Sequence, residues 1–378
     1  MNNNVSENPR AQHPATPKCV GEAISGTTAK ELCAIDSGFA FDSEQFNTDG
    51  DGMPIIRIRD IKPGVTNTYT TEAFDSRYLV NDGDMLIGMD GEFNLVKWHS
   101  GSALLNQRVC RIQSKSTLLL DDYLRHFLPV ALKQIEMRTA CVTVKHLSIK
   151  ALNAIEIPLV SMERQRAIAF QLDNIDEQLG IARKQLSMLD SLVKSRFIEM
   201  FGDPNHSHSH NAVYLEDAFD VRDDLRKPLN SKTRSDMKAG ELYPYYGANG
   251  IVDFINAFIT DCDALCFAED CGSYGADEQS TYIVRGKAWV NNHAHFLLAK
   301  PCCILEWANV YFYLLDIGKM ISGTTRSKLT QAQLKRIMVD LPPLALQQEF
   351  ADFVAQVDKL RFEACYAMYL LCAAFTLL

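Results

Sequence analysis

The sequence of 378 residues lacks the short motifs by which many enzymes hold nucleotides, water or metal ions. It contains no Gly-x-x-x-x-Gly-Lys-Ser/Thr loop, no Gly-x-Gly-x-x-Gly turn, no Gly-x-Ser-x-Gly turn and no His-Glu-x-x-His pair. These absences argue against a nucleoside triphosphatase, a dinucleotide-dependent enzyme, a serine hydrolase of that type and a zinc peptidase. Its one Pro-Pro pair, Pro342-Pro343, lies between leucines, so the Asn/Asp-Pro-Pro-Tyr/Phe motif of amino-methyltransferases is missing too. The sequence therefore favours a binding protein without a cofactor.

No stretch reaches the roughly 20 apolar residues that a membrane helix needs. The apolar C-terminus, residues 364–378, is too short for this. Residues 1–30 are rich in Asn, Thr, Pro and Ala and have no apolar run, so we predict a flexible tail and no signal peptide. We therefore expect a cytoplasmic chain without contact to a membrane.

The eleven cysteines are scattered and lack paired Cys-x-x-Cys spacing, which favours buried reduced thiols over a metal site. A zinc cluster remains the alternative, built from Cys262, Cys266, Cys271, Cys302 and Cys303. Runs of Lys and Arg are also missing, and the formal net charge is −9. Proteins that bind duplex DNA unaided usually carry a basic surface. Any contact with DNA must therefore come from local clusters or be shared with a partner.

What the chain does contain is a repeat. Residues 147–176 match residues 329–358 at a constant offset of 182, with Leu147, Gln165 and Asp176 answering Leu329, Gln347 and Asp358. This offset exceeds the 20–50 residues of a solenoid repeat. It indicates two mixed α/β modules, each followed by the same helix, in an α+β chain.

Within each module, apolar patterns predict strands and a helix. In the first module we expect a strand over 54–59 with Arg57 and Arg59 on one face, and further elements in this order: a buried strand over 85–89, a strand over 105–112 and a helix over 121–138. In the second we expect a turn-rich aromatic segment over 243–250, strands over 264–268 and 288–296, and a helix over 304–315.

Each module is followed by a long helix with the three-four apolar spacing of a coiled coil. The seam positions are Leu172, Ile175, Leu179, Leu186, Leu189 and Val193 in the first helix, and Val354, Val357, Met368 and Leu371 in the second. Beyond Glu363 the second helix has no charged residue, so either a partner covers it or the natural tail has been altered. The predicted division is a tail 1–30, a module 31–157, a helix 158–204, a linker 205–212, a module 213–340 and a helix 341–378.

Several segments together resemble the specificity subunit of type I restriction–modification enzymes. They are Ile157-Pro158-Leu159, Gln165, Leu172-Asp173-Asn174-Ile175-Asp176 and Ser195–Pro204, with a second copy in Leu329-Thr330 and Leu341-Pro342-Pro343-Leu344. Ser37–Phe41, Tyr245–Gly250 and Trp289–His295 are similar to segments of that family's two target recognition domains. The resemblance covers residues 30 to 362, and the apolar tail departs from it.

The resemblance implies two target recognition domains separated by two antiparallel coiled-coil helices in a pseudo-two-fold repeat. Each domain would read one half of a bipartite, asymmetric double-stranded DNA target, and the helices would set the spacer. Two methyltransferase subunits would dock on this scaffold and motor–nuclease subunits would join them, while the chain itself would be non-catalytic. The alternatives are a complete restriction or methylating enzyme, and an inactive or recombined relic acting only as an assembly scaffold.

Base recognition favours Arg, Lys and amide or hydroxyl side chains on loops. In the first module the candidates for DNA contact are Arg57, Arg59, Lys97, Asn106, Gln107 and Arg108. In the second they are Asn249, Ser273, Tyr274, Asn291, Asn292 and His293, with Thr324, Thr325, Arg326 and Lys328 in a basic loop suited to phosphate. For each, an ordinary turn or exposed strand face is the alternative interpretation.

Overall fold

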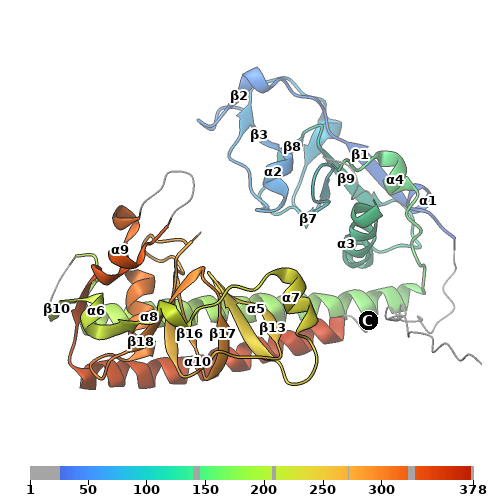
Figure 1. The fold of residues 1–378 in the computed structure, drawn as a ribbon. Coiled ribbons are helices and arrows are strands. Elements are labelled where there is room, and N and C mark those ends of the chain that lie inside the picture. Colours follow the sequence, from blue (N-terminus) through green and yellow to red (C-terminus); the bar gives the residue numbers. More distant parts are fainter. Residues whose placement is uncertain (1–25, 139–144, 207–209, 271, 322–327, 376–378) are drawn as a thin grey trace, which may run out of the picture. The chain divides into compact units, whose positions relative to one another are not determined.

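A computed structural model describes residues 26–138, 145–206, 210–270, 272–321 and 328–375 (Figure 1). The chain forms two compact units, Met1–Leu179 with Leu371–Leu378, and Gly180–Leu370. Each unit contains two β-sheets and short helices, and the two long helices have residues in both. None of the described helices has the length and apolarity needed to cross a membrane.

The first sheet of unit 1 is antiparallel and is covered by one helix. Its order is β1 (Cys33–Ser37), β9 (Val109–Ser114), β6 (Met85–Gly88), β7 (Leu95–Lys97). Leu124, Leu128 and Leu132 repeat every fourth residue along α3 (Asp121–Arg138), so they form one apolar stripe that packs with Ile87 and Ile112 of the sheet. The helix predicted over 121–138 and the buried strand predicted over 85–89 are thus confirmed.

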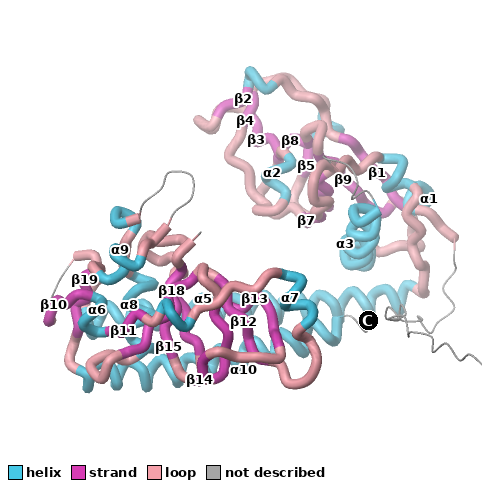
Figure 2. Tube along the Cα trace, in the orientation of Figure 1, coloured by secondary structure: helices cyan, strands magenta, loops and turns pink. Residues whose placement is uncertain are grey.

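The second sheet of unit 1 has the order β2 (Phe46–Asn47), β4 (Tyr69–Thr70), β3 (Met53–Ile56), β8 (Ala103–Leu105), β5 (Leu79–Val80), with β3 and β8 parallel (Figure 2). The strand predicted over 54–59 is wrong in its second half. It ends at Ile56, because the Arg57 backbone N–H is accepted by Asp60 and starts helix α2 (Ile58–Ile61). The strand predicted over 105–112 is likewise broken by a turn at residues 106–108.

Unit 2 repeats this plan. One antiparallel sheet has the order β11 (Phe219–Val221), β18 (Ala294–Ala299), β15 (Ala264–Ala268), β16 (Thr281–Val284) and is covered by α8 (Leu305–Leu314). The other has the order β13 (Gly250–Ile255), β12 (Tyr243–Gly247), β17 (Lys287–Val290), β14 (Thr260–Asp261), with β12 and β17 parallel. The strand over 264–268 and the helix over 304–315 are confirmed. The strand predicted over 288–296 is broken at residues 291–293, and the segment predicted as turns over 243–250 is mostly strand β12.

The beginning of each unit is hydrogen-bonded to its last segment before the long helix. Ala29 N–H donates to the Ile155 carbonyl at 2.8 Å, and Leu215 N–H donates to the Ile337 carbonyl at 2.8 Å. In unit 2 these segments are β10 (Asn211–Tyr214) and β19 (Met338–Leu341) with α6 (Leu215–Ala218) and α9 (Gln331–Lys335); in unit 1 they are α1 (Ala29–Leu32) and α4 (Ile149–Asn153).

Two predicted boundary segments are partly structured. Residues 26–30 of the predicted tail belong to unit 1, where Thr28 bridges to Glu156, and residues 1–25 lie outside the described part. Asn211 and Ala212 of the predicted linker are in strand β10. The remaining short elements are α7 (Ser231–Asp236), η1 (Ser43–Gln45), η2 (Ser76–Tyr78), η3 (Asp223–Leu225) and η4 (Gly318–Met320).

The long helices are α5 (Met162–Phe201) and α10 (Leu344–Phe375). Within unit 2 they run antiparallel, because Asp190 bonds Arg361 at 2.7 Å whereas Arg196, further along α5, bonds Glu349, nearer the start of α10, at 2.9 Å. Six of the predicted seam residues are buried: Leu172, Ile175, Leu179, Val193, Val354 and Val357. The other four are half-buried: Leu186, Leu189, Met368 and Leu371.

Candidate nucleic-acid interface

A three-residue turn, Asn106–Arg108, joins β8 to β9 in unit 1 and is fixed at both ends. The buried Asn106 accepts the Gln107 N–H on Oδ1 at 2.8 Å. Arg108 Nη1 lies 2.6 Å from one oxygen of Asp90, and His146 Nδ1 lies 2.6 Å from the other. The backbone joins the same parts, because Met89 N–H donates to the Arg108 carbonyl at 3.0 Å. We call Asp90, Asn106, Gln107, Arg108 and His146 the turn cluster of unit 1.

Gly38 allows a second segment to pack against this turn. A Cβ at position 38 would lie 2.1 Å from the Asn106 carbonyl oxygen, so only glycine fits. The neighbouring Phe39 donates its N–H to the Leu105 carbonyl at 2.9 Å and accepts the Gln107 N–H at 2.8 Å. Backbone contacts from two sides therefore hold Gln107 in place.

Unit 2 has the same arrangement at the turn Asn291–His293 between β17 and β18. The buried Asn291 accepts the His293 N–H on Oδ1 at 2.8 Å, and His293 Nδ1 lies 3.0 Å from Asp270 Oδ2. Lys328 Nζ lies 3.1 Å from Glu269 and 4.0 Å from Asp270. The Glu269 N–H donates to the His293 carbonyl at 2.8 Å, as Met89 does to Arg108. We call Asp270, Asn291, Asn292, His293 and Lys328 the turn cluster of unit 2.

The carboxylates in these clusters are held ionised by their cations. Burial raises the pKa of the Asp90 carboxyl, but hydrogen bonds from His146 and Arg108 outweigh burial and lower the pKa below its ordinary value. Burial also raises the pKa of Glu269, and the hydrogen bonds of Arg226 and Lys328 reverse the effect. The hydrogen bond to Glu269 in turn raises the pKa of Lys328. Each cluster thus presents cations at a position fixed by buried or half-buried acid groups.

A buried network supports the turn of unit 2 from beneath. His295, 1% exposed, lies on β18 with Nδ1 2.8 Å from Asp223 and Nε2 2.8 Å from the Leu329 carbonyl. Arg226 contacts Asp223 at 3.0 Å and Glu269 at 2.6 Å. Sequence reasoning missed Asp223, Arg226 and His295, and treated the pair Glu269-Asp270 as a strand-end turn.

Of the other candidates in unit 1, Arg59 is exposed on α2. Arg57 is half-buried and its guanidinium lies 3.6 Å from Asp60, so it also stabilises the start of that helix. Lys97 on β7 pairs with Asp122 at 3.2 Å. Arg59 is therefore the cation of this group best placed to meet an external phosphate.

In unit 2, Asn249 is exposed in the turn between β12 and β13, and Ser273 is exposed. Tyr274 is buried, and its hydroxyl donates to the Ala268 carbonyl at 3.0 Å, so its side chain closes the loop after β15. The candidates Thr324, Thr325 and Arg326 lie outside the described residues. Only Lys328 of that predicted basic loop can be placed.

In the described part of the chain no group of three or more His, Cys, Asp or Glu residues is arranged to hold a metal ion. Four of the cysteines considered for zinc are described, and all four are free: Cys262, Cys266, Cys302 and Cys303. Burial raises the pKa of Cys266 to about 12, which keeps it a neutral thiol. Cys271 lies outside the described residues.

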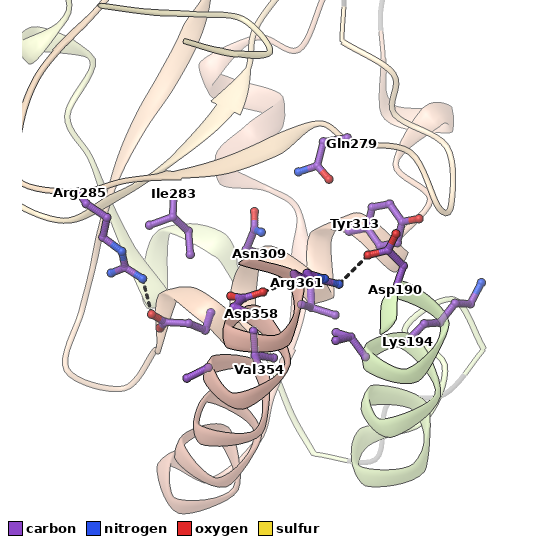
Figure 3. A pocket seen from close by; sticks show the side chains of 14 residues that line it. Asp190, Lys194, Gln279, Ile283, Arg285, Asn309, Tyr313, Val354, Asp358 and Arg361 are labelled. Carbon is purple, nitrogen blue, oxygen red and sulfur yellow. Dashed lines mark hydrogen bonds and ion pairs between the residues drawn. The ribbon is translucent and has the colours of Figure 1, made fainter. Parts of the chain in front are cut away.

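A cavity of about 590 Å³ lies in unit 2 between α8 and the two long helices (Figure 3). Arg361 reaches across it from α10 to Asp190 on α5 at 2.7 Å and also bonds Asp358 at 2.8 Å. Arg285 pairs with Glu306 at its other side. These charges of both signs are paired with one another, so the cavity is bordered by contacts that join the helices to the unit.

The family comparison decides how these observations are to be understood. A family model described as "Type I restriction modification DNA specificity domain" matches residues 27–190 and, a second time, residues 212–364. The chain belongs to this family.

Curated relatives in the specificity family align mainly with part of the chain. The EcoBI specificity subunit of Escherichia coli is 40% identical over 160 residues, which is 42% of this chain and 34% of the relative. A putative specificity subunit of Haemophilus influenzae, S.HindORF215P, is 32% identical over 151 residues, 39% of this chain and 37% of the relative. These alignments thus span about a third of those relatives. The MjaVIII specificity subunit of Methanocaldococcus jannaschii is 20% identical, and its alignment covers 81% of this chain and 79% of the relative.

Solved structures show the same fold over nearly the whole chain. The S subunit of a type I restriction–modification system from M. genitalium superposes with a TM-score of 0.62 at 18% identity, covering 95% of this chain and 96% of the other. A chain from a study of complex assembly and conformational transition of the type I R-M system gives a TM-score of 0.50 at 14% identity, covering 93% and 95%. The predicted fold class, with its two modules and two long helices, is thereby confirmed.

The two family matches correspond to the repeated frame. They begin at residues 27 and 212, where each unit first pairs with its own closing segment, and they end at residues 190 and 364, inside α5 and α10. The uncharged end of α10 lies beyond the second match. It exposes Phe362, Tyr366, Tyr369 and Leu370 along or just before that end.

Proposed function

We propose that this chain reads a bipartite, asymmetric double-stranded DNA target, with one half-site bound by each unit. The single observation that carries this proposal is the pair of turn clusters. Their backbone hydrogen bonds match: Met89 to Arg108 answers Glu269 to His293, and Leu147 to Met89 answers Leu329 to Glu269. Their side chains differ: Gln107, Arg108 and His146 stand where unit 2 has Asn292, His293 and Lys328. A shared frame with different polar groups suits two related sites that read different bases.

The long helices suit a second role, as a scaffold of fixed length. An α-helix rises about 1.5 Å per residue, so the distance between two units joined by such helices is set by residue number. We propose that the helices set the spacer between half-sites and dock two methyltransferase subunits, which motor–nuclease subunits join for restriction. In this assembly the specificity chain is non-catalytic, works in the cytoplasm and needs no cofactor.

The net charge of −9 supports shared binding. Affinity for DNA comes largely from neutralised phosphates, and an acidic chain with only local cations provides few such contacts. We therefore expect tight binding only when a methyltransferase subunit contributes further phosphate contacts.

Footprinting of the chain together with its methyltransferase subunit tests this function. The expected result is two protected half-sites separated by unprotected spacer bases. One contiguous protected site would contradict the assignment of one half-site to each unit. The isolated chain should protect neither half-site at the same concentration, which serves as the control for the shared contacts.

The alternative, an inactive or recombined relic acting only as a scaffold, is favoured by one observation. The exposed aromatic residues Phe362, Tyr366 and Tyr369 and the uncharged segment after them lie at or beyond the end of the family match. A relic would assemble with the methyltransferase subunit yet protect no specific sequence. Removing residues 364–378 and repeating both the co-purification and the footprint separates assembly through this end from DNA recognition.

A further inference from the structure

The middle residue of each turn stands out from its neighbours. Gln107 and Asn292 are exposed, and among the described residues neither side-chain amide has a hydrogen-bond partner. The residues on either side are engaged, Asn106 and Asn291 with the turn backbone, and Arg108 and His293 with a carboxylate. One uncommitted amide is thus held at the same structural position in each unit.

We propose that Gln107 and Asn292 each read an adenine, at the equivalent position of the two half-sites. An amide side chain carries one acceptor and two donors, which match the N6 donor and N7 acceptor that adenine presents in the major groove. This inference rests on the proposed function and adds to it the base that the two half-sites share.

The other polar groups of the clusters are less suited to reading bases. Arginine is the usual reader of guanine, but Arg108 is bound to Asp90 at 2.6 Å. A carboxylate could accept from cytosine, but Asp90 is occupied by Arg108 and His146, and Asp270 by His293. The amide is therefore the group of each turn whose donors and acceptor are available to a base edge.

The turns also have the rigidity that base recognition needs. Gln107 is held through its N–H by both Asn106 Oδ1 and the Phe39 carbonyl, each at 2.8 Å. The Asn292 carbonyl accepts from Arg226 at 3.4 Å, and the same guanidinium donates to the Ala294 carbonyl at 2.9 Å. A side chain on a backbone fixed in this way loses little entropy on binding, so a wrong base is not accommodated by movement of the loop.

Cations on either side of each amide can position the phosphates. They are Arg108 and His146 in unit 1 and His293 and Lys328 in unit 2, each about half exposed. Contacts of this kind orient a protein on the duplex without selecting sequence. The amide and its flanking cations thus divide recognition into a specific and a positioning part.

The test uses the chain in complex with its methyltransferase subunit and a duplex library with randomised bases. We expect the selected sequences to contain an adenine at a corresponding position in each half-site. Gln107→Ala should reduce the preference for that adenine about ten-fold or more in one half-site and leave the other half-site unchanged. Asn292→Ala should do the reverse, so each variant is the control for the other. Gln107→Arg should move the preference toward guanine.

Gln134→Ala, which removes an exposed amide from α3 of unit 1, is the matched control and should change neither half-site. Thermal melting of each variant shows that the unit is folded. The inference is overturned if Gln107→Ala and Asn292→Ala keep both base preferences, or if they weaken binding to every sequence equally. Selection of one continuous site by the unaltered complex would instead overturn the proposed function itself, so the two failures can be told apart.

Discussion

Gln165 and Gln347, 182 residues apart, make the same three hydrogen bonds at the starts of the two long helices. Gln165 Oε1 accepts the Leu120 N–H at 2.9 Å, and its Nε2 donates to the carbonyls of Leu118 and Val160. Gln347 accepts the Ile304 N–H at 2.8 Å and donates to Cys302 and Pro342. Both side chains are fully buried. Each glutamine thereby fixes the first turn of its helix to the segment that precedes the module's own covering helix.

Replacement of Gln347 by leucine should destabilise unit 2 by about 2–4 kcal/mol, because it leaves one N–H and two carbonyls without their partner in a buried place. Urea denaturation followed by circular dichroism measures this change. Gln348→Leu is the matched control, since that neighbouring side chain is exposed and bonds only Asp352 on the same helix. An equal loss in both variants would show that the buried hydrogen bonds are not the cause.

Phe197 of α5 should be a main contributor to the stability of unit 2. It is buried against Trp307 of α8 and Phe350 of α10, with ring centroids 6.4 and 5.3 Å away. Phe197→Ala should lower the free energy of unfolding by about 3–5 kcal/mol through the cavity it leaves. Ile198→Ala, at the next and exposed position, should cost well under about 1 kcal/mol in the same denaturant titration.

The contribution of Asp90 to stability should depend on pH. Its folded pKa is lowered, so the contribution is complete above the unfolded value of about 3.9 and is lost as pH falls through the folded pKa. At pH 7 Asp90→Asn should be less stable than the unaltered chain by about 1 kcal/mol, since Arg108 and His146 are partly exposed to solvent. Denaturation midpoints measured from pH 7 down to pH 3 should converge below about pH 4. A difference that stays constant over this range would assign the loss to packing.

Lengthening α5 should alter the spacer and leave the half-site bases unchanged. Four inserted residues add about one turn, or roughly 6 Å, which corresponds to about two base pairs at 3.4 Å each. Selection from a duplex library with variable spacers measures the change, and replacing four exposed residues of α5 without altering its length is the control. A change in half-site sequence with the same spacer would contradict the ruler function of the helices.

The longest and most regular patterns were the most predictable parts of the fold. The apolar stripe of Asp121–Arg138 extends over several turns, and the observed helix has the predicted bounds. The strands predicted over 105–112 and 288–296 were each two strands in reality. Their turns, Asn106–Arg108 and Asn291–His293, contain no Gly or Pro, because an asparagine side chain closes each turn in place of a special backbone conformation.

The candidate site was predictable in its local part and not in its distant part. Asn106–Arg108 and Asn291–His293 were selected as polar segments, but Asp90 and His146 lie far from them in sequence and meet Arg108 only through the sheet. One signal for them was present, since an Asp follows a buried strand in both modules, as Asp90 after β6 and Asp270 after β15. Tyr274 was chosen for its type, whereas its burial depends on contacts that no local pattern shows.

The closing contact of each unit has an evolutionary consequence. Because Thr28 bridges to Glu156, and Asn211–Tyr214 pairs with Met338–Leu341, the peptide chain comes into each unit and leaves it at neighbouring points. Segments with adjacent termini tolerate insertion and exchange, since the flanking chain need not be re-routed. Recombination at these two points can transplant a whole unit onto the existing helices. A lineage could in this way acquire a new target by combining two modules that already fold, without passing through intermediates that have lost their scaffold.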